Sequence, residues 1–369
     1  MRTGVSTPMP DISSKRIEAI CNGRRRFIAG IAAAGVGSLA SPFAFDLPSA
    51  QTQAAPNRRL IDVHHHFVPP FYVAENKHRI LASGGGQNPA WWKWSPDTAI
   101  AAMDKNGVST AVLSLTFPGV WFGNPHEAAE MARRVNEYAA ELAQNHPGRF
   151  GVFATIPLPD PETSLREIEY AFTVLKADGI GVLTSYDDKW LGNSAYKPVF
   201  EELHRRKAVV FVHPTVPSCC RALLPEVAPV IAEVPQDTTR AVTNLLFTGT
   251  FSRFKDIRFI FPHAGGDVPM IAGRMQDYAP KDIVQKAPNG IEYELKRLHY
   301  DIAGTAFRPA IAALMSLVPT TQILFGSDDP FVPLAKTAEG IMQLDLPGAD
   351  LQRIGRENAL SLLPRLRPT

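Results

Sequence analysis

The stretch Ile61-Asp62-Val63-His64-His65-His66 ends a short apolar run with three consecutive histidines. Its composition predicts a β-strand over residues 60–66. Alternate side chains of a strand face the same way, so His64 and His66 point together and His65 points to the opposite face. Two imidazoles fixed side by side can share one metal ion. A solvated histidine run is the alternative that this stretch alone leaves open.

Seven further short β-rich runs follow along the chain. Several are continuously apolar, such as Val209-Val210-Phe211-Val212, which is typical of parallel strands covered on both faces. Amphipathic helical patterns separate these runs and are clearest over residues 127–144, 163–175 and 199–205. Eight strands alternating with helices predict a (β/α)8 barrel of the α/β class. The expected strands are residues 60–66, 111–115, 151–157, 179–184, 209–213, 258–262, 299–302 and 323–325.

Polar side chains end three more of the predicted strands. His213 ends the fifth, His263 follows the sixth and Asp328 follows the eighth. The carboxyl ends of all strands in such a barrel meet at one rim, where barrel enzymes keep their chemistry. Buried histidines and carboxylates cost free energy unless they are paired or bind a metal. The sequence therefore predicts a functional site that joins these residues to His64 and His66.

The amino-terminal 55 residues have the character of a leader. The segment Gly23-Arg24-Arg25-Arg26-Phe27-Ile28 precedes a weakly apolar stretch and then small residues, as in a signal peptide. Paired arginines indicate the twin-arginine type. We expect residues 1–55 to be this leader, residues 56–369 to form the barrel domain, and the protein to be exported to the periplasm without stable membrane insertion. A disordered basic leader with no export role is the alternative.

Composition limits the classes of partner. The net charge of +2 comes from 38 basic and 36 acidic residues, so we expect no nucleic-acid partner. Cys21 falls in the leader, and Cys219 and Cys220 are adjacent, a spacing whose ring geometry is strained. We therefore expect no disulfide framework.

Two segments interrupt the strand–helix repeat, residues 82–96 and the proline-rich residues 215–235. Both follow carboxyl ends of strands, where long loops commonly form lids or pocket walls. The first contains Trp91, Trp92 and Trp94, which suit a flat ring. Burial in a subunit interface is an equal alternative for these tryptophans.

Taken together, His64-x-His66, His213, His263-Ala264-Gly265-Gly266 and Gly326-Ser327-Asp328 resemble the amidohydrolase superfamily. The chain looks most like the branch of aminocarboxymuconate-semialdehyde decarboxylase, and within it like 6-methylsalicylate decarboxylases, from about residue 60 to residue 363. The resemblance implies that His64, His66, His213 and Asp328 hold a metal and that His263 is the catalytic histidine beside a metal-bound water.

The resemblance also assigns Arg274, eleven residues after His263, to the substrate carboxylate of a neighbouring subunit, which implies a homodimer. A salt bridge on the helix surface is the alternative for this arginine. Two-metal members carry a carboxylated lysine at the end of strand four. No lysine ends strand four here, and Lys189 lies further along the chain, so one divalent metal is expected. Three histidines and a carboxylate suit zinc, and manganese is credible.

We hypothesise that the enzyme is a non-oxidative decarboxylase of a small aromatic hydroxy acid. Asp328 or His263, or a metal-bound water, would carry the proton to the ring, and Trp91 and Trp94 would bind its face. A metal-dependent hydrolase of a lactone or amide would use the same residues, because one fold supports many reactions. An exported metal-binding protein without turnover is a third hypothesis, against which the additional rim histidine His263 argues.

Overall fold

The computed structural model of the protein describes residues 59–367 except residues 87, 188 and 221–222. The predicted leader, residues 1–55, lies outside the described residues, so its role in export stays a prediction. No helix within the described part of the chain is long and apolar enough to cross a membrane.

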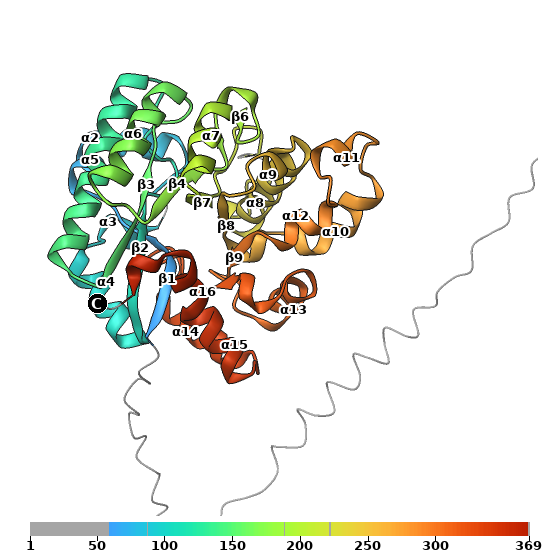
Figure 1. The fold of residues 1–369 in the computed structure, drawn as a ribbon. Coiled ribbons are helices and arrows are strands. Elements are labelled where there is room, and N and C mark those ends of the chain that lie inside the picture. The colour runs from blue at the N-terminus through green and yellow to red at the C-terminus, as the bar shows by residue number, and fades with distance from the viewer. Residues whose placement is uncertain (1–58, 87, 188, 221–222, 368–369) are drawn as a thin grey trace, which may run out of the picture. The chain divides into compact units, whose positions relative to one another are not determined.

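Eight parallel strands form one sheet in the order β1-β2-β3-β4-β7-β8-β9-β10. The first and last strands meet, because the Val63 amide donates to the Phe325 carbonyl at 3.0 Å and His65 forms a parallel bridge with Asp329. The predicted (β/α)8 barrel is thereby confirmed, with its helices outside the strands (Figure 1). The strands are β1 (Leu60–His66), β2 (Val108–Ser114), β3 (Phe150–Thr155), β4 (Gly179–Leu183), β7 (Val209–His213), β8 (Arg258–Phe261), β9 (His299–Asp301) and β10 (Ile323–Leu324), with a small hairpin of β5 (Ser185–Tyr186) and β6 (Lys189–Trp190).

Strand ends differ from the expected ones by up to three residues. The largest difference is at β2, which begins at Val108 because that residue pairs with Leu60 at the start of β1. Strand pairing therefore extends β2 beyond the apolar run that reveals it in the sequence.

Many helices begin with proline, whose missing N–H would be unpaired in the first turn in any case. Capping side chains add to this, as where Asp160 accepts from the Glu162 amide at 3.0 Å before α6. The helices are α2 (Pro70–Ala82), α3 (Pro89–Trp92), α4 (Pro96–Asn106), α5 (Pro125–Asn145), α6 (Pro161–Thr173), α7 (Lys197–Arg205), α8 (Pro229–Phe247), α9 (Thr250–Arg253), α10 (Val268–Asp277), α11 (Ile283–Lys286), α12 (Ile291–Lys296), α13 (Arg308–Leu317), α14 (Leu334–Gly340), α15 (Gly348–Gln352) and α16 (Asn358–Leu362).

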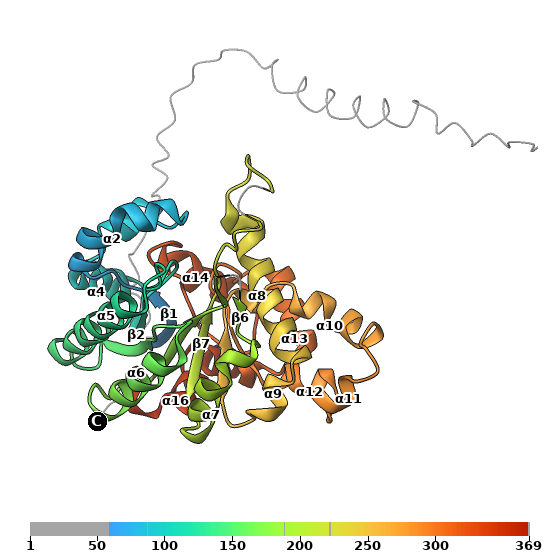
Figure 2. The same cartoon turned by 90° about the horizontal axis from the view of Figure 1, so that it is seen from above.

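The two interrupting segments are more ordered than the sequence suggested. The tryptophan-rich segment contains the short helix α3, and α8 begins at Pro229 and continues through Pro235. The expectation of a loop over residues 215–235 is therefore wrong for its last seven residues. Within this helix the Thr239 hydroxyl donates to the Pro235 carbonyl at 2.9 Å. Figure 2 shows the remainder of this segment extending from the barrel beside α8.

Side chains fill the barrel interior. Phe153 and Phe211 stack with ring centroids 5.5 Å apart, and Ile61 and Leu324 belong to the same buried cluster. At the amino-terminal end of the strands Leu366 packs so closely that a Cβ added to Gly151 would lie 2.8 Å from it. The interior is a packed core, which leaves the carboxyl-terminal rim for chemistry.

Candidate active site

The predicted metal-binding residues converge at the carboxyl-terminal rim. His64 and His66 end β1, His213 ends β7 and Asp328 follows β10. One ligand atom from each lies within 4.8 Å of all the others, and all four residues are buried. The Nε2 atoms of His64 and His66 are 3.0 Å apart, and Asp328 Oδ1 lies 3.3 Å and 3.1 Å from them.

Hydrogen bonds on the outer side of each histidine orient its ring. Every Nδ1 faces an oxygen acceptor, so each ring donates its Nδ1–H and turns the lone pair of Nε2 toward the centre. The acceptors are Asp301 Oδ2 for His64 at 3.0 Å, the Ser114 carbonyl for His66 at 3.2 Å and the Pro214 carbonyl for His213 at 2.8 Å. Three inward nitrogens and one carboxylate oxygen fit a single divalent metal.

The electrostatics of the cluster also favour a cation at its centre. Burial opposes a charge on His64, but the carboxylates of Asp301 and Asp328 outweigh it and raise the pKa of His64 to about 10. Burial would raise the pKa of Asp328, yet the neighbouring His64 and His263 hold it well below its usual range. Burial and the adjacent histidines lower the pKa of His213. The two carboxylates beside His64 therefore favour a positive charge at the centre of the cluster.

His263 lies beside this cluster, as predicted for a catalytic residue. Its Nε2 is 3.5 Å from Asp328 Oδ2, and its buried Nδ1 has no hydrogen-bond partner among the described residues. His263 and Asp328 both adopt left-handed backbone angles, with φ of 56° and 66°. At Gly265, φ is +77° and an added Cβ would lie 2.7 Å from the Tyr300 ring. The glycine of this motif therefore allows the chain to turn and present His263 to the rim.

The tryptophans stand behind the site rather than in it. Trp91 is wholly buried, with its ring centroid 6.0 Å from that of Phe331, which in turn lies 5.6 Å from the His66 ring. Trp94 is partly buried and packs edge-on against Phe67 at 6.1 Å. Phe331 therefore reaches the metal-binding residues, and Trp91 supports it. No surface of Trp91 is available to a ligand in this conformation.

Arg274 is exposed on α10. Its guanidinium lies 5.0 Å from the centroid of the Tyr278 ring, and no ion pair or hydrogen bond of its side chain is present in the described part of the chain. The surface salt bridge considered as an alternative is therefore not observed. Lys189 is exposed on the β5–β6 hairpin, and Thr184 occupies the rim of β4.

Two buried carboxylates of the site were not singled out from the sequence. Asp301 binds His64 and also accepts from the backbone amides of His263 at 3.2 Å and Ala303 at 2.9 Å. Asp62 accepts from the backbone amides of His64 at 3.1 Å and Ser327 at 2.8 Å, which ties β1 to the segment after β10. Both lie within predicted strands. An acidic residue inside an apolar strand was the available signal.

Asp237 of α8 gave no such signal, since a carboxylate on a helix usually faces solvent. It is fully buried and accepts from the Thr215 amide at 2.7 Å and from the Thr184 hydroxyl. The Thr184 amide donates to the His213 carbonyl at 3.0 Å, so Asp237 links the rim of β4 to the loop after the metal-binding histidine. Burial raises the pKa of Asp237 to about 6.

A cavity of about 230 Å³ lies between the segments that follow β2, β4 and β7, at the same carboxyl-terminal rim as the cluster, and no metal-binding residue lines it. Thr116, whose hydroxyl is 3.5 Å from His213 Nε2, directly precedes the lining residue Phe117. The lining combines apolar and aromatic side chains with hydroxyl groups and the carboxylate of Asp187, which accepts from Trp121 Nε1 at 2.8 Å. It includes Phe117, Pro118, Trp121, Phe122, Leu183, Tyr186 and Thr215.

The family and the relatives to which this chain is similar agree with the metal-binding geometry described above. The family described as Amidohydrolase matches residues 61–365. The chain belongs to this family. Decarboxylase macB of Penicillium terrestre is 33% identical to it over 330 residues, which cover 83% of this chain and 95% of macB. The 6-methylsalicylic acid decarboxylase of Penicillium expansum is 32% identical over 321 residues, covering 83% of this chain and 97% of that enzyme.

Solved structures share the fold. The 5-carboxyvanillate decarboxylase of Novosphingobium aromaticivorans, solved with manganese and 3-methoxy-4-hydroxy-5-nitrobenzoic acid, superposes with a TM-score of 0.75 at 21% identity. The match covers 83% of this chain and 97% of that one. The barrel fold is therefore shared with that decarboxylase.

Proposed function

We propose that the protein is a metal-dependent, non-oxidative decarboxylase of a small aromatic hydroxy acid similar to 6-methylsalicylate. The observation that carries this proposal is the inward-facing cluster of His64, His66, His213 and Asp328 with His263 beside it. Family relatives of about one-third identity that match over nearly their full length are decarboxylases, one of them of 6-methylsalicylic acid.

The donor set favours zinc, because three imidazole nitrogens and one carboxylate oxygen are typical zinc ligands. Manganese is the second candidate, since a neighbour of the same fold contains it. When bound, the ion supplies a Lewis acid that holds the substrate carboxylate and its adjacent hydroxyl. The hydrogen bonds to Asp301, Ser114 and Pro214 keep the three histidines oriented for this ligand.

His263 is placed to carry the proton. Asp328 stays ionised because its histidine neighbours lower its pKa, so it serves best as a ligand and as the hydrogen-bond partner of His263. The protonated ring of His263 would deliver a proton to the ring carbon that bears the carboxylate. The bond from that carbon to the carboxylate then breaks, its electron pair restores the aromatic ring and carbon dioxide leaves.

The cavity between the segments that follow β2, β4 and β7 would hold the aromatic ring of the substrate. Its volume of about 230 Å³ admits one substituted benzene ring, and its aromatic wall suits a flat apolar face. Phe331, supported by Trp91, packs against the His66 ring outside this cavity. Trp94 contributes through Phe67, so we propose that both tryptophans shape the aromatic pocket indirectly.

Carbon dioxide release from a panel of hydroxybenzoates that includes 6-methylsalicylate tests the proposal, with zinc- and manganese-reconstituted protein. His263→Ala should abolish release while metal content is unchanged, and His126→Ala, an exposed histidine on α5, should change neither. Turnover of lactones or amides without carbon dioxide release would assign the site to hydrolysis instead. Metal binding with no turnover of any compound would favour a binding protein.

We further propose that residues 1–55 direct export by the twin-arginine route, and that residues 56–369 are the mature enzyme. The paired arginines support this. Arg24→Lys combined with Arg25→Lys should move the protein from the periplasmic to the cytoplasmic fraction. An unchanged distribution would contradict the export proposal.

We also propose a homodimer in which Arg274 approaches the partner's substrate. Arg274 lacks an acidic partner in the described residues; Met270 on the same helix and Tyr278 directly after it are 73% and 75% exposed. Exposed apolar groups beside an unpaired cation are typical of a surface that a second protein covers. Light scattering should give twice the chain mass, and Arg274→Gln should raise KM for the carboxylate more than it lowers kcat.

A further inference from the structure

A second cavity, of about 750 Å³, lies at the amino-terminal end of the barrel strands. Its lining includes Ser109 and Phe150, near the starts of β2 and β3, and Leu366 near the end of the chain. The metal-binding cluster lies at the opposite end, where the strands finish. The proposed decarboxylation therefore makes no use of this cavity.

The cavity is strongly basic. Its lining contains six cationic side chains and no acidic one: Arg59, Arg149, Lys176, Arg356, Arg365 and Arg367. Two of the six form ion pairs with carboxylates that do not line the cavity: Arg149 with Asp104 at 2.7 Å, and Arg365 with Asp178 at 3.2 Å. The other four form no ion pair with an acidic side chain of the described residues. Four uncompensated positive charges thus surround one cavity.

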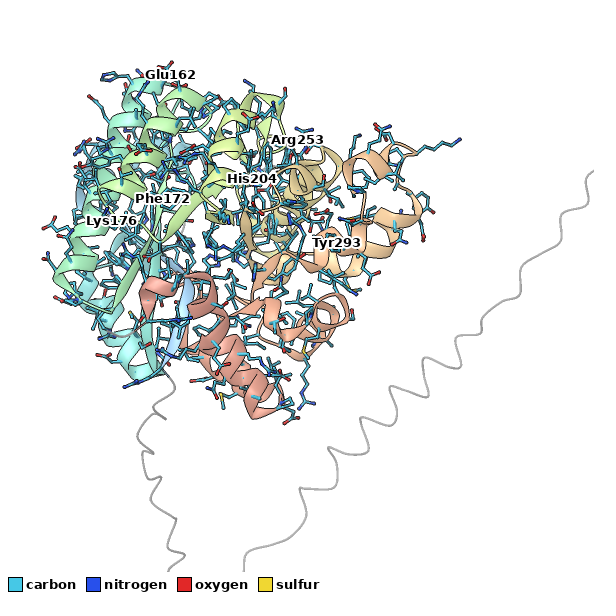
Figure 3. The ribbon with its side chains drawn as sticks, in the orientation of Figure 1. Glu162, Phe172, Lys176, His204, Arg253 and Tyr293 are labelled. Atoms are coloured by element: carbon cyan, nitrogen blue, oxygen red, sulfur yellow. The ribbon has the colours of Figure 1, made fainter. Side chains whose placement is uncertain are left out.

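Uncommon backbone conformations bring three of these cations to the cavity. Arg59 and Lys176 have left-handed φ angles of 47° and 56°, which are unfavourable for side chains with a Cβ. Arg356 lies in the π-helical turn Arg353–Glu357, a rare element that is frequent at functional sites. These segments are far apart in sequence, and Lys176 is labelled in Figure 3. Cations from three separate segments thus approach the same cavity.

The Arg356 guanidinium is held in position. Its Nη1 donates to the Arg59 carbonyl at 2.7 Å and to the Ser109 hydroxyl at 3.1 Å, which leaves its other N–H groups available. Burial and the positive charge of Arg59 lower the pKa of Arg356. Like charges held this close repel each other, and a bound anion would remove that repulsion.

We propose that this cavity binds a small anion that carries two or more phosphate groups. Cations approach it from four separate segments of the chain, and a diphosphate presents oxygens in all directions, whereas a carboxylate presents two in one plane. Guanidinium groups pair well with phosphate oxygens through parallel hydrogen bonds. This site is independent of the proposed decarboxylase activity.

Isothermal titration of the full-length, metal-loaded protein with inorganic pyrophosphate, at constant ionic strength, tests the proposal. We expect saturable binding of one pyrophosphate per chain, weakened at least tenfold by Lys176→Gln and by Arg356→Gln. Lys207→Gln is the matched control for the lysine, because Lys207 is exposed with a φ of 51° and lies outside the lining. Arg353→Gln is the control for the arginine, because Arg353 belongs to the same π-helical turn but pairs with Asp350 at 3.0 Å. Both controls should bind within twofold of the unmodified protein.

Pyrophosphate can also remove the metal, and the heat of that reaction would be the same in all variants. Binding at the cavity is therefore judged from the difference in affinity between the cavity variants and the control variants. Thermal unfolding is the second measurement: pyrophosphate should raise Tm of the unmodified protein and of the controls, but not of the cavity variants. Absence of saturable binding, or equal weakening in the controls, would overturn the proposal. Citrate binding as tight as that of pyrophosphate would overturn the assignment to phosphate.

Discussion

Asp301→Asn should weaken metal binding although the new side chain has the same size. All three groups that face the Asp301 carboxylate are donors: His64 Nδ1–H at 3.0 Å and the backbone amides of His263 and Ala303. An asparagine must turn its NH2 group toward at least one of them. If it faces His64, the imidazole moves its proton to Nε2 and loses the lone pair that binds the metal; if it faces the amides, the His263 turn is disturbed.

Loss of such an outer carboxylate typically weakens metal affinity about 10- to 100-fold, or about 1.4–2.7 kcal/mol. Competition with a chromophoric chelator measures this affinity, and circular dichroism verifies that the variant folds. Asp345→Asn, at an exposed carboxylate that pairs with Arg308, is the control and should bind metal normally. A folded Asp301→Asn protein whose metal affinity stays within twofold of the unmodified protein would refute the role given to Asp301.

Three further outcomes follow from the site. Burial raises the folded-state pKa of Asp237 to about 6 from 3.8, so its contribution to stability is present below the lower value and is lost as pH rises through about 6. Urea unfolding should be measured for the unmodified protein and for Asp237→Asn between about pH 4 and pH 7. The free energy of unfolding of the unmodified protein, relative to that of the variant, should fall by up to about 3 kcal/mol over this range. A free-energy difference that does not change with pH would contradict this. Gly326→Ala would place a Cβ 2.8 Å from both Asp301 Cγ and His64 Cβ, so unfolding measurements should show a loss of about 1–3 kcal/mol together with weaker metal binding. Removal of the metal by a chelator should lower Tm, because a ligand at 100 times its Kd stabilises the fold by about 2.7 kcal/mol; His213→Ala should lose this dependence, and a Tm insensitive to the chelator in the unmodified protein would argue against a resident metal.

Much of the barrel could be predicted from local patterns. The apolar runs located all eight strands, and the three helical patterns named from the sequence begin two residues after the starts of α5, α6 and α7. The predictions were wrong where contacts with other segments determine the ends of a strand or helix. Pairing with Leu60 extends β2 back to Val108, and α8 includes Pro235 although proline usually stops a helix.

The predicted metal-binding residues could be found because each ends a strand, and strand ends share one rim whatever the details of packing. Their supporting residues could not be ranked in the same way. Asp301 stands out only as an acidic residue within a predicted strand, and Asp237 lies on a helix like many exposed carboxylates. The partners that give each its role come from distant segments.

The sequence by itself determined the alternation of strands and helices, the rim on which His64, His66, His213, His263 and Asp328 lie, and through these the family. These features depend on local periodicity and on spacing within the repeat. Only the tertiary structure decided which nitrogen of each histidine faces the metal position, that Phe331 rather than Trp91 reaches the site, and that basic residues from separate segments share one cavity. Each of these depends on contacts across long sequence separations, which a one-dimensional pattern does not contain.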